Sequence, residues 1–231
     1  MVGLFALIKQ TTFLLSLLNA NPILDISLKK NKQMKNLLTT LLLLICLTSF
    51  GQVTFTNAPQ NKQLVARNLN TNLGTVNISG TVNNSGVNYD AIEVVVIRGG
   101  IFEDSRVSES LSFSGNMAPF NIDVTINSEL TNYTIIINGL DGANTTQIMQ
   151  ATEVVAGDVF IVQGQSNAEA NERSGSADAN NSNFIRVYAS GTENGTNLQN
   201  NDNWFVAQGD GDKETDGNAG QWGLKLAKML Q

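Results

Sequence analysis

The sequence contains no histidine and a single cysteine among its 231 residues. Without histidine, the chain cannot build a His-ligated metal site or a Ser–His or Cys–His catalytic pair from its own residues. One cysteine excludes an intrachain disulfide and a zinc site made of several thiolates. Acidic residues outnumber basic ones by 20 to 14, for a formal net charge of −6. Because non-specific nucleic-acid binding requires clustered cations, we expect no nucleic-acid partner.

A signal-peptide pattern occupies residues 34–51. Lys35 supplies a short positive region, Leu37–Leu47 an apolar run, and Thr48–Gly51 an exit of mostly small residues. This order is typical of a secretory signal peptide, and the run is too short to favour a membrane span. We therefore expect a secreted, periplasmic or cell-surface protein with no stable membrane span in the mature chain.

The N-terminus leaves several alternatives open. An uncleaved membrane anchor over the same residues is one of them. A lipid-modified Cys46 is another, but the bulky Leu44 and Ile45 before it argue against such a site. Residues 1–33 precede the signal and hold a second apolar run and a basic patch. Because the signal begins with its own methionine, we expect that translation starts at Met34 and that the extension is misassigned; a genuine anchor helix is the alternative.

Residues 53–155 carry the pattern of a β-rich domain. Apolar and polar residues alternate from Phe120 to Asn127, which puts one face of a strand in a core and the other in water. Short strands separated by Asn/Gly/Ser turns over about 100 residues predict an immunoglobulin-like β-sandwich. Further strands are expected at Gly74–Val82, Ile92–Arg98 and Tyr133–Asn138, with turns at Asn83–Gly86 and Asn138–Gly139.

Residues 156–231 have a different pattern. The apolar run Asp158–Val162 predicts a strand buried on both faces, and Phe184–Tyr188 predicts a second one. Gly220–Gln231 predicts a helix. Strand, loop, strand and helix open an α/β domain, but a parallel sheet needs more elements than these. We therefore expect a truncated domain and an N-terminal fragment. The helix residues expected to share one face are Trp222, Leu226 and Leu230.

A serine stands just past the carboxyl end of the first of these predicted strands. In Val162–Asn167, Gly164 permits a tight turn and the asparagine can hydrogen-bond locally. Open α/β sheets bind ligands at this edge, and an exposed Ser166 hydroxyl can act as a nucleophile. The G-x-S-x-G pattern of α/β-hydrolases is not met because residue 168 is alanine. By spacing alone, a structural serine in a polar loop is the commoner case.

The stretch GDVFIVQGQSN, behind a signal peptide and a predicted sandwich, resembles the SGNH/GDSL-type esterases. The closer resemblance is to their sialate O-acetylesterase-like and acetylxylan-esterase-like members. It covers roughly residues 118–231 and is strongest at 154–167. The resemblance implies a flavodoxin-like catalytic domain that removes O-acetyl groups from carbohydrates through an acyl-enzyme. Its implied partner is an acetylated carbohydrate, and we expect no cofactor and no metal.

The resemblance assigns roles to particular residues. It makes Ser166 the nucleophile and gives its backbone N–H to the oxyanion hole. Gly223 is the candidate for the second N–H and Gly220 the alternative, although simple helix N-terminal geometry would explain both glycines. The residues expected to support the turn are Gly164, Gln165 and Asn167.

The sequence departs from the family pattern in two respects. Many relatives have methionine after G-Q-S-N, where this chain has Ala168. The family's later Asn or Gln block and its Asp-x-x-His pair have no counterpart, so Ser166 lacks a general base. We expect the full-length protein to be an esterase and this chain to be inactive. The other function class is a surface carbohydrate-binding or adhesion protein, in which the sandwich carries the function.

Three further features bear on metal binding, sugar binding and solubility. Within the acidic loop 210–216, the pattern from Asp212 to Gly217 resembles a calcium loop, but the twelfth position counted from Asp212 would be Gly223 instead of glutamate, which favours a solvated loop. Trp204 and Phe205 could line a sugar subsite, although core packing is the commoner role. The sandwich alone is expected to be soluble. The apolar side chains expected to be left uncovered by truncation are Val159, Ile161, Ile185 and Val187.

Overall fold

The computed structural model describes residues 52–84, 88–163, 177–188, 193–194, 197–198, 202–209, 217 and 219–231. Within these ranges the chain is mostly β-strand with a single α-helix, so its predominantly β character is confirmed. No helix among these residues combines the length and apolar character that a membrane crossing requires. Predictions that lie outside the described residues concern the extension 1–33, the signal 34–51, the acidic loop 210–216, and Ser166 with Gly164, Gln165 and Asn167.

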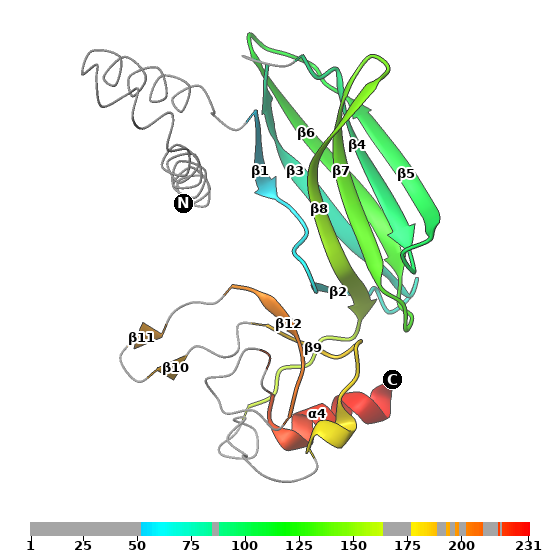
Figure 1. Cartoon of the computed structure of the whole chain (residues 1–231), viewed down its shortest axis with the longest axis vertical. Coiled ribbons are helices and arrows are strands. Elements are labelled where there is room, and N and C mark those ends of the chain that lie inside the picture. The colour runs from blue at the N-terminus through cyan, green and yellow to red at the C-terminus, as the bar shows by residue number, and fades with distance from the viewer. Residues whose placement is uncertain are drawn as a thin grey trace, which may run out of the picture. The chain divides into compact units, whose positions relative to one another are not determined.

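The first eight strands form two sheets (Figure 1). One has three strands in the order β1-β3-β6, and the other has five in the order β2-β8-β7-β4-β5. The pair β2–β8 is parallel, whereas β3–β6, β4–β5, β4–β7 and β7–β8 are antiparallel. The strands are β1 (Val53–Asn57), β2 (Leu64–Ala66), β3 (Leu73–Asn83), β4 (Ala91–Arg98), β5 (Phe102–Ser110), β6 (Met117–Asn127), β7 (Tyr133–Asp141) and β8 (Asn144–Gly157).

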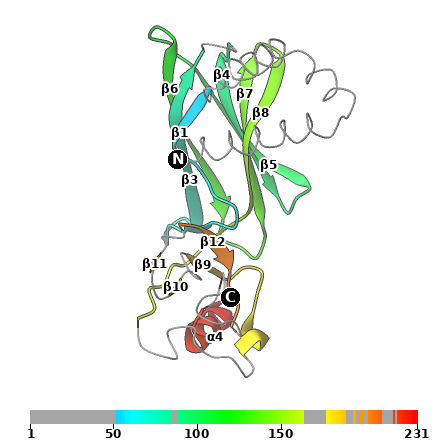
Figure 2. The ribbon, with the colours of Figure 1, turned by 60° about the vertical axis from the view of Figure 1, so that its left-hand side comes forward.

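The two sheets form separate layers in the turned view of Figure 2. Strand β6 buries every second residue, which confirms the alternation predicted from Phe120 to Asn127. Phe120 also packs edge-to-face on Phe55 of β1, with ring centroids 6.0 Å apart. Burial of one aliphatic face on each sheet is the main stabilising contribution to such a fold. Fully buried core side chains include Ile78, Val82, Ile92, Val94, Val96, Ile135 and Ile137.

The strands predicted within residues 53–155 are confirmed, but one predicted turn is wrong. Asn138 and Gly139 lie inside β7, where both are buried. A Cβ at Gly139 would meet the ring of Tyr89 at 2.6 Å. The glycine is therefore there to admit a close aromatic neighbour, which is a usual reason for glycine within a strand. The turn predicted at Asn83–Gly86 begins where β3 ends, and its last two residues lie outside the described ranges.

The run Asp158–Val162 does not form the predicted buried strand. Residues 158–163 have no strand structure, and Ile161 is 96% exposed. A strand requires a neighbour for its backbone N–H and C=O groups, and no described strand pairs with this run. The prediction that Val159 and Ile161 are uncovered is confirmed for these side chains, both of which are exposed.

The remaining described residues form small elements around a short helix. Strand β9 pairs antiparallel with β12, which is not the parallel pairing expected of the predicted α/β sheet. The predicted helix is confirmed as α4. The elements are η1 (Ala177–Asn180), β9 (Arg186–Tyr188), β10 (Glu193–Asn194), β11 (Asn197–Leu198), β12 (Trp204–Val206) and α4 (Gln221–Leu230).

A small core joins these elements. Ile185, Ala207 and Leu224 are buried together, and Val187 packs against them. The prediction that Ile185 and Val187 are uncovered is therefore wrong, because α4 and the residue after β12 cover them. The helix α4 packs against this core with the face that carries Leu224. The predicted common face of Trp222, Leu226 and Leu230 is exposed.

Candidate functional site

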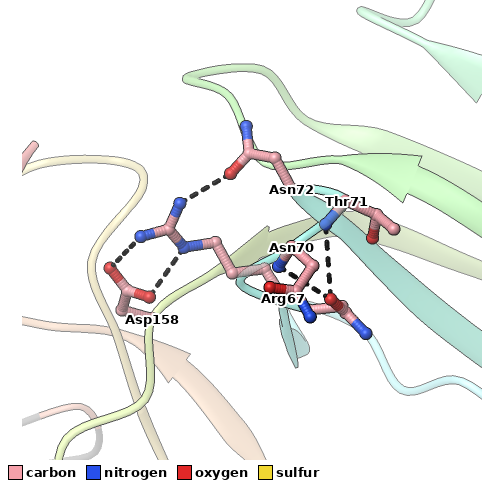
Figure 3. Close-up of polar contacts among 6 residues, drawn as sticks. Arg67, Asn70, Thr71, Asn72 and Asp158 are labelled. Carbon is pink, nitrogen blue, oxygen red and sulfur yellow. Dashed lines mark hydrogen bonds and ion pairs between the residues drawn. The ribbon is translucent and has the colours of Figure 1, made fainter.

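An arginine–carboxylate pair marks the point where the chain leaves the five-stranded sheet. Arg67 follows β2, and Asp158 follows the last residue of β8. The guanidinium donates from Nε to Asp158 Oδ1 at 2.7 Å and from Nη2 to Oδ2 at 2.9 Å (Figure 3). This bidentate geometry is that of strong Arg–carboxylate pairs. The hydrogen bonds from Arg67 lower the pKa of Asp158 below its usual value. The start of the segment that leads to Ser166 is thus held by a charged pair.

A tight turn after β2 orients the same arginine. Asn72 Oδ1 accepts a 2.6 Å hydrogen bond from Arg67 Nη1. Asn68 closes the turn, because its Oδ1 accepts bonds from the N–H groups of Asn70 at 2.8 Å and Thr71 at 3.3 Å (Figure 3). Asn72 has a φ of 58°, a left-handed conformation that asparagine tolerates better than most residues. The turn residues explain why Arg67 faces Asp158.

Val162, at the end of the exposed run Asp158–Val162, lies beside the first turn of α4. A Cβ built at Gly223 would lie 3.5 Å from Cγ2 of Val162, so the valine side chain is close to this glycine. Gly220 is the N-cap and makes no side-chain cap hydrogen bond, and its carbonyl accepts from Leu224 N at 3.0 Å. The N–H groups of the first three helical residues, Gly223 among them, have no acceptor within the helix. The structure therefore brings Val162 close to Gly223, and Gly220 begins the same helix.

Ser166 lies outside the described residues, as do Gly164, Gln165 and Asn167. In the sequence, Ser166 follows Val162 by four residues.

An aromatic pair lies on the antiparallel strands β9 and β12. The rings of Tyr188 and Trp204 are 5.0 Å apart between centroids and tilted by 50°. The Tyr188 hydroxyl also contacts Asp202 Oδ1 at 3.4 Å. Trp204 and Phe205 are both half-buried, so neither side chain is a fully buried core residue. A sugar subsite at these two residues stays a prediction.

Sequence analysis did not single out Arg186, the buried arginine of β9. It is 9% exposed, and its guanidinium donates to backbone carbonyls of Lys62 at 2.9 Å and Glu153 at 3.0 Å. Burial lowers the pKa of this guanidinium. The signal was present in the sequence, because an arginine within the apolar run Phe184–Tyr188 must find buried acceptors.

No group of three or more His, Cys, Asp or Glu side chains among the described residues could hold a metal ion. Of the predicted acidic loop and its flank, the structure describes Gly217, which has a φ of 83°. A Cβ there would lie 2.6 Å from the carbonyl oxygen of Val206. This glycine is thus required by close backbone packing and by its left-handed conformation, which gives it a role independent of any cation.

Comparison with known proteins adds no assignment. No model of a known protein family matches the chain, and no curated protein matches it. The family resemblance drawn from GDVFIVQGQSN therefore stays a prediction.

Proposed function

We propose that this chain belongs to an exported serine esterase that removes O-acetyl groups from carbohydrates, with Ser166 as its nucleophile. The proposal combines the G-Q-S-N sequence with one structural observation, the closeness of the Val162 side chain to Gly223. The described segment that precedes Ser166 thus lies beside the first N–H groups of a helix. Such groups favour negative charge, and an acyl-transfer site requires donors of this kind.

In the proposed reaction, the Ser166 hydroxyl attacks the acetyl carbonyl and the deacetylated sugar leaves. Water then hydrolyses the acetyl-enzyme to acetate and free serine. The N–H groups of Ser166 and Gly223 stabilise the oxyanion of each tetrahedral intermediate, and Gly220 is the alternative donor. One such preorganised donor typically contributes about 3 kcal/mol. The chain contains no histidine, so none of these 231 residues can act as a histidine base for Ser166.

We also propose that the two sheets are an immunoglobulin-like sandwich. The order β1-β3-β6 against β2-β8-β7-β4-β5, with β2 parallel to β8, supports this assignment. Tyr133 at the start of β7 supports it further. Its hydroxyl accepts a 3.3 Å bond from Asn127 N, six residues upstream. This is the bond pattern of the tyrosine corner found in such folds.

The proposed activity is tested by acetate release. The reading frame that contains this chain is expressed in wild-type form and as Ser166→Ala, and both proteins are incubated with O-acetylated sialic acid and O-acetylated xylan. We expect the wild type to release acetate and Ser166→Ala to lose at least about 1000-fold in rate, as is typical when a catalytic nucleophile is removed. Ser176→Ala is the matched control, because this serine belongs to the same polar stretch between Val162 and Phe184. This variant should retain the wild-type rate.

Two results would overturn the proposal. One is a wild-type protein that binds the acetylated sugar without releasing acetate, which would favour the carbohydrate-binding or adhesion function. The other is acetate release that survives Ser166→Ala, which would show that another residue is the nucleophile.

Gly223→Ala retains its backbone N–H, and its new Cβ, at 3.5 Å from Val162, introduces only an ordinary contact. It should therefore keep most of the activity.

A further inference from the structure

The buried Arg186 side chain reaches from β9 to three acceptors on the sandwich. Nε donates to Lys62 O at 2.9 Å, and Nη2 donates to Glu153 O at 3.0 Å and to Asn132 Oδ1 at 3.3 Å. Nη1 donates to the carbonyl of Asn183 on its own side. None of the described carboxylates forms an ion pair with Arg186. Carbonyl and amide oxygens accept its hydrogen bonds, and the charge of Glu153 also favours the protonated guanidinium.

The two sandwich carbonyls belong to residues in an unusual conformation. Lys62 has a φ of 63° and Glu153 a φ of 58°, both in the left-handed region that non-glycine residues seldom adopt. Glu153 lies at an irregularity of β8, where the pairing with β7 shifts between Tyr133 and Ile135. Bulges of this kind re-aim backbone groups. Strain at two separate positions thus aims two carbonyl oxygens at one guanidinium, and we call Lys62, Glu153 and Asn132 the carbonyl cradle.

Further hydrogen bonds hold the cradle in shape without Arg186. Lys62 N donates to Thr152 O at 2.8 Å, and Asn61 Oδ1 accepts from Thr152 N at 2.8 Å. Asn132 O accepts from Gly99 N at 2.9 Å. The acceptors are therefore preorganised within the sandwich, which reduces the entropy lost when a guanidinium binds them.

A second contact holds the chain where it leaves the sandwich. Asp158, the first residue after β8, pairs with Arg67 in the bidentate geometry described above. Arg67 N also donates to Gly157 O at 3.0 Å, which continues the β2–β8 pairing to the end of β8. One contact thus orients the chain as it leaves the sandwich, and the other holds β9 after the chain has turned back.

We propose that the carbonyl cradle is a docking site for Arg186 and that this contact joins residues 177–231 to the sandwich as one cooperative folding unit. The sandwich is then a fixed support for the region that follows it and not a module on a flexible linker. This inference does not depend on esterase activity, and a failed acetate-release assay leaves it standing.

The two tryptophans make the coupling measurable. Both of them, Trp204 and Trp222, lie in the region after the sandwich, so their fluorescence reports unfolding of that region. Far-UV circular dichroism is dominated by β1–β8. The full chain is unfolded in urea and followed by both signals. In the wild type we expect the two transitions to coincide, as a single cooperative unit requires. Two separated transitions in the wild type would overturn the proposal.

Arg186→Met removes the charge and the donors while keeping an apolar side chain of similar length. We expect its tryptophan transition to move about 1 M or more to lower urea, with a smaller shift of the dichroism transition, so that the two separate. Transitions that still coincide in this variant would show that Arg186 does not couple the regions. Arg106→Met is the matched control, because Arg106 pairs with Glu93 and Glu103 inside the sandwich, and its two transitions should move together.

A third variant covers the case in which Arg186→Met does not fold. Asn132→Ala removes only the side-chain acceptor of the cradle. Its two transitions should separate by a smaller amount than in Arg186→Met, and coincident transitions in this variant, with Arg186→Met unfolded, would contradict the docking role of the cradle.

Discussion

At the scale of single residues, Arg98, Glu129 and Tyr133 form a polar cluster at the corner before β7. Arg98 donates to both carboxylate oxygens of Glu129, at 2.6 and 2.5 Å. The Tyr133 hydroxyl donates to Glu129 Oε1 at 2.5 Å. These hydrogen bonds, led by that from Arg98, lower the pKa of Glu129 from its usual 4.5 to about 2. The charged form of Glu129 is therefore favoured by the folded protein.

The depressed pKa of Glu129 predicts a loss of stability in acid. Its contribution is fully present above the unfolded value near 4.5 and is lost as the pH falls towards 2. Glu129→Gln should lower the urea midpoint at pH 7 and flatten the decline between pH 5 and 2.5. The decline should not vanish, because the pKa values of Asp158 and Glu103 are also lowered by their arginine partners.

The control for this measurement is Asp104→Asn. Asp104 is exposed, and the described residues offer it no hydrogen-bond or ion-pair partner. This variant should follow the wild-type pH profile. A Glu129→Gln profile that is as steep as that of the wild type would contradict the assigned role of Glu129.

The contact between Gly139 and the Tyr89 ring gives a second prediction at this scale. Gly139→Ala would place a Cβ 2.6 Å from that ring, and such overpacking typically costs about 1–3 kcal/mol. In Gly157→Ala the new Cβ would meet Leu64 at an ordinary 3.5 Å, and the cost should be about 0.5 kcal/mol or less. Urea unfolding of both variants checks the difference, and equal stabilities would contradict the packing.

At the scale of elements, the sequence was informative where alternation is regular. Strand β6 was predictable because one face is apolar throughout, and α4 because its apolar residues recur at helical spacing. The positions of other elements depend on contacts that a pattern does not contain. Asn138–Gly139 has the composition of a turn, but its residues pair with Glu93 and Ile92 of β4 and so lie inside a strand. The run Asp158–Val162 has the composition of a buried strand, but no described strand pairs with it.

The helix α4 gives the prediction at this scale. Leu224 is 1% exposed against Ile185 and Ala207, whereas Leu226 is 38% exposed. Leu224→Ala should therefore cost about 2–5 kcal/mol, the usual range for a buried leucine, and Leu226→Ala clearly less. Tryptophan-detected urea unfolding measures both. A larger loss for Leu226→Ala would show that the face of Trp222, Leu226 and Leu230 is the one that packs.

At the scale of the whole molecule, the sequence predicted the β-rich character of the first region and the order in which the regions follow. It did not predict the long-range contacts that hold the chain after β8. The Arg67–Asp158 pair joins residues 91 positions apart, and Arg186 lies 124 positions from Lys62. Contacts of this separation leave no periodic trace in a single sequence. Of the candidate site, only the G-Q-S-N motif could be recognised from the sequence. The N–H groups of α4 that could donate hydrogen bonds to the oxyanion are distant from Ser166 in the chain.

The absence of histidine gives a prediction for the isolated chain. Without a general base, the Ser166 hydroxyl is a poor nucleophile at neutral pH. Purified residues 52–231 should hydrolyse an aryl acetate no faster than buffer, and Ser166→Ala should behave in the same way. Hydrolysis that Ser166→Ala abolishes would show that this segment supplies its own base.

The most direct measurement is covalent labelling of the protein isolated from its natural source. A fluorophosphonate probe reacts with an activated serine, and mass spectrometry of the digested protein identifies the labelled residue. We predict a label on Ser166 that disappears when the protein is unfolded by heat before the probe is added. An unlabelled Ser166, in a sample where an added reference serine hydrolase is labelled, would contradict its role as the nucleophile.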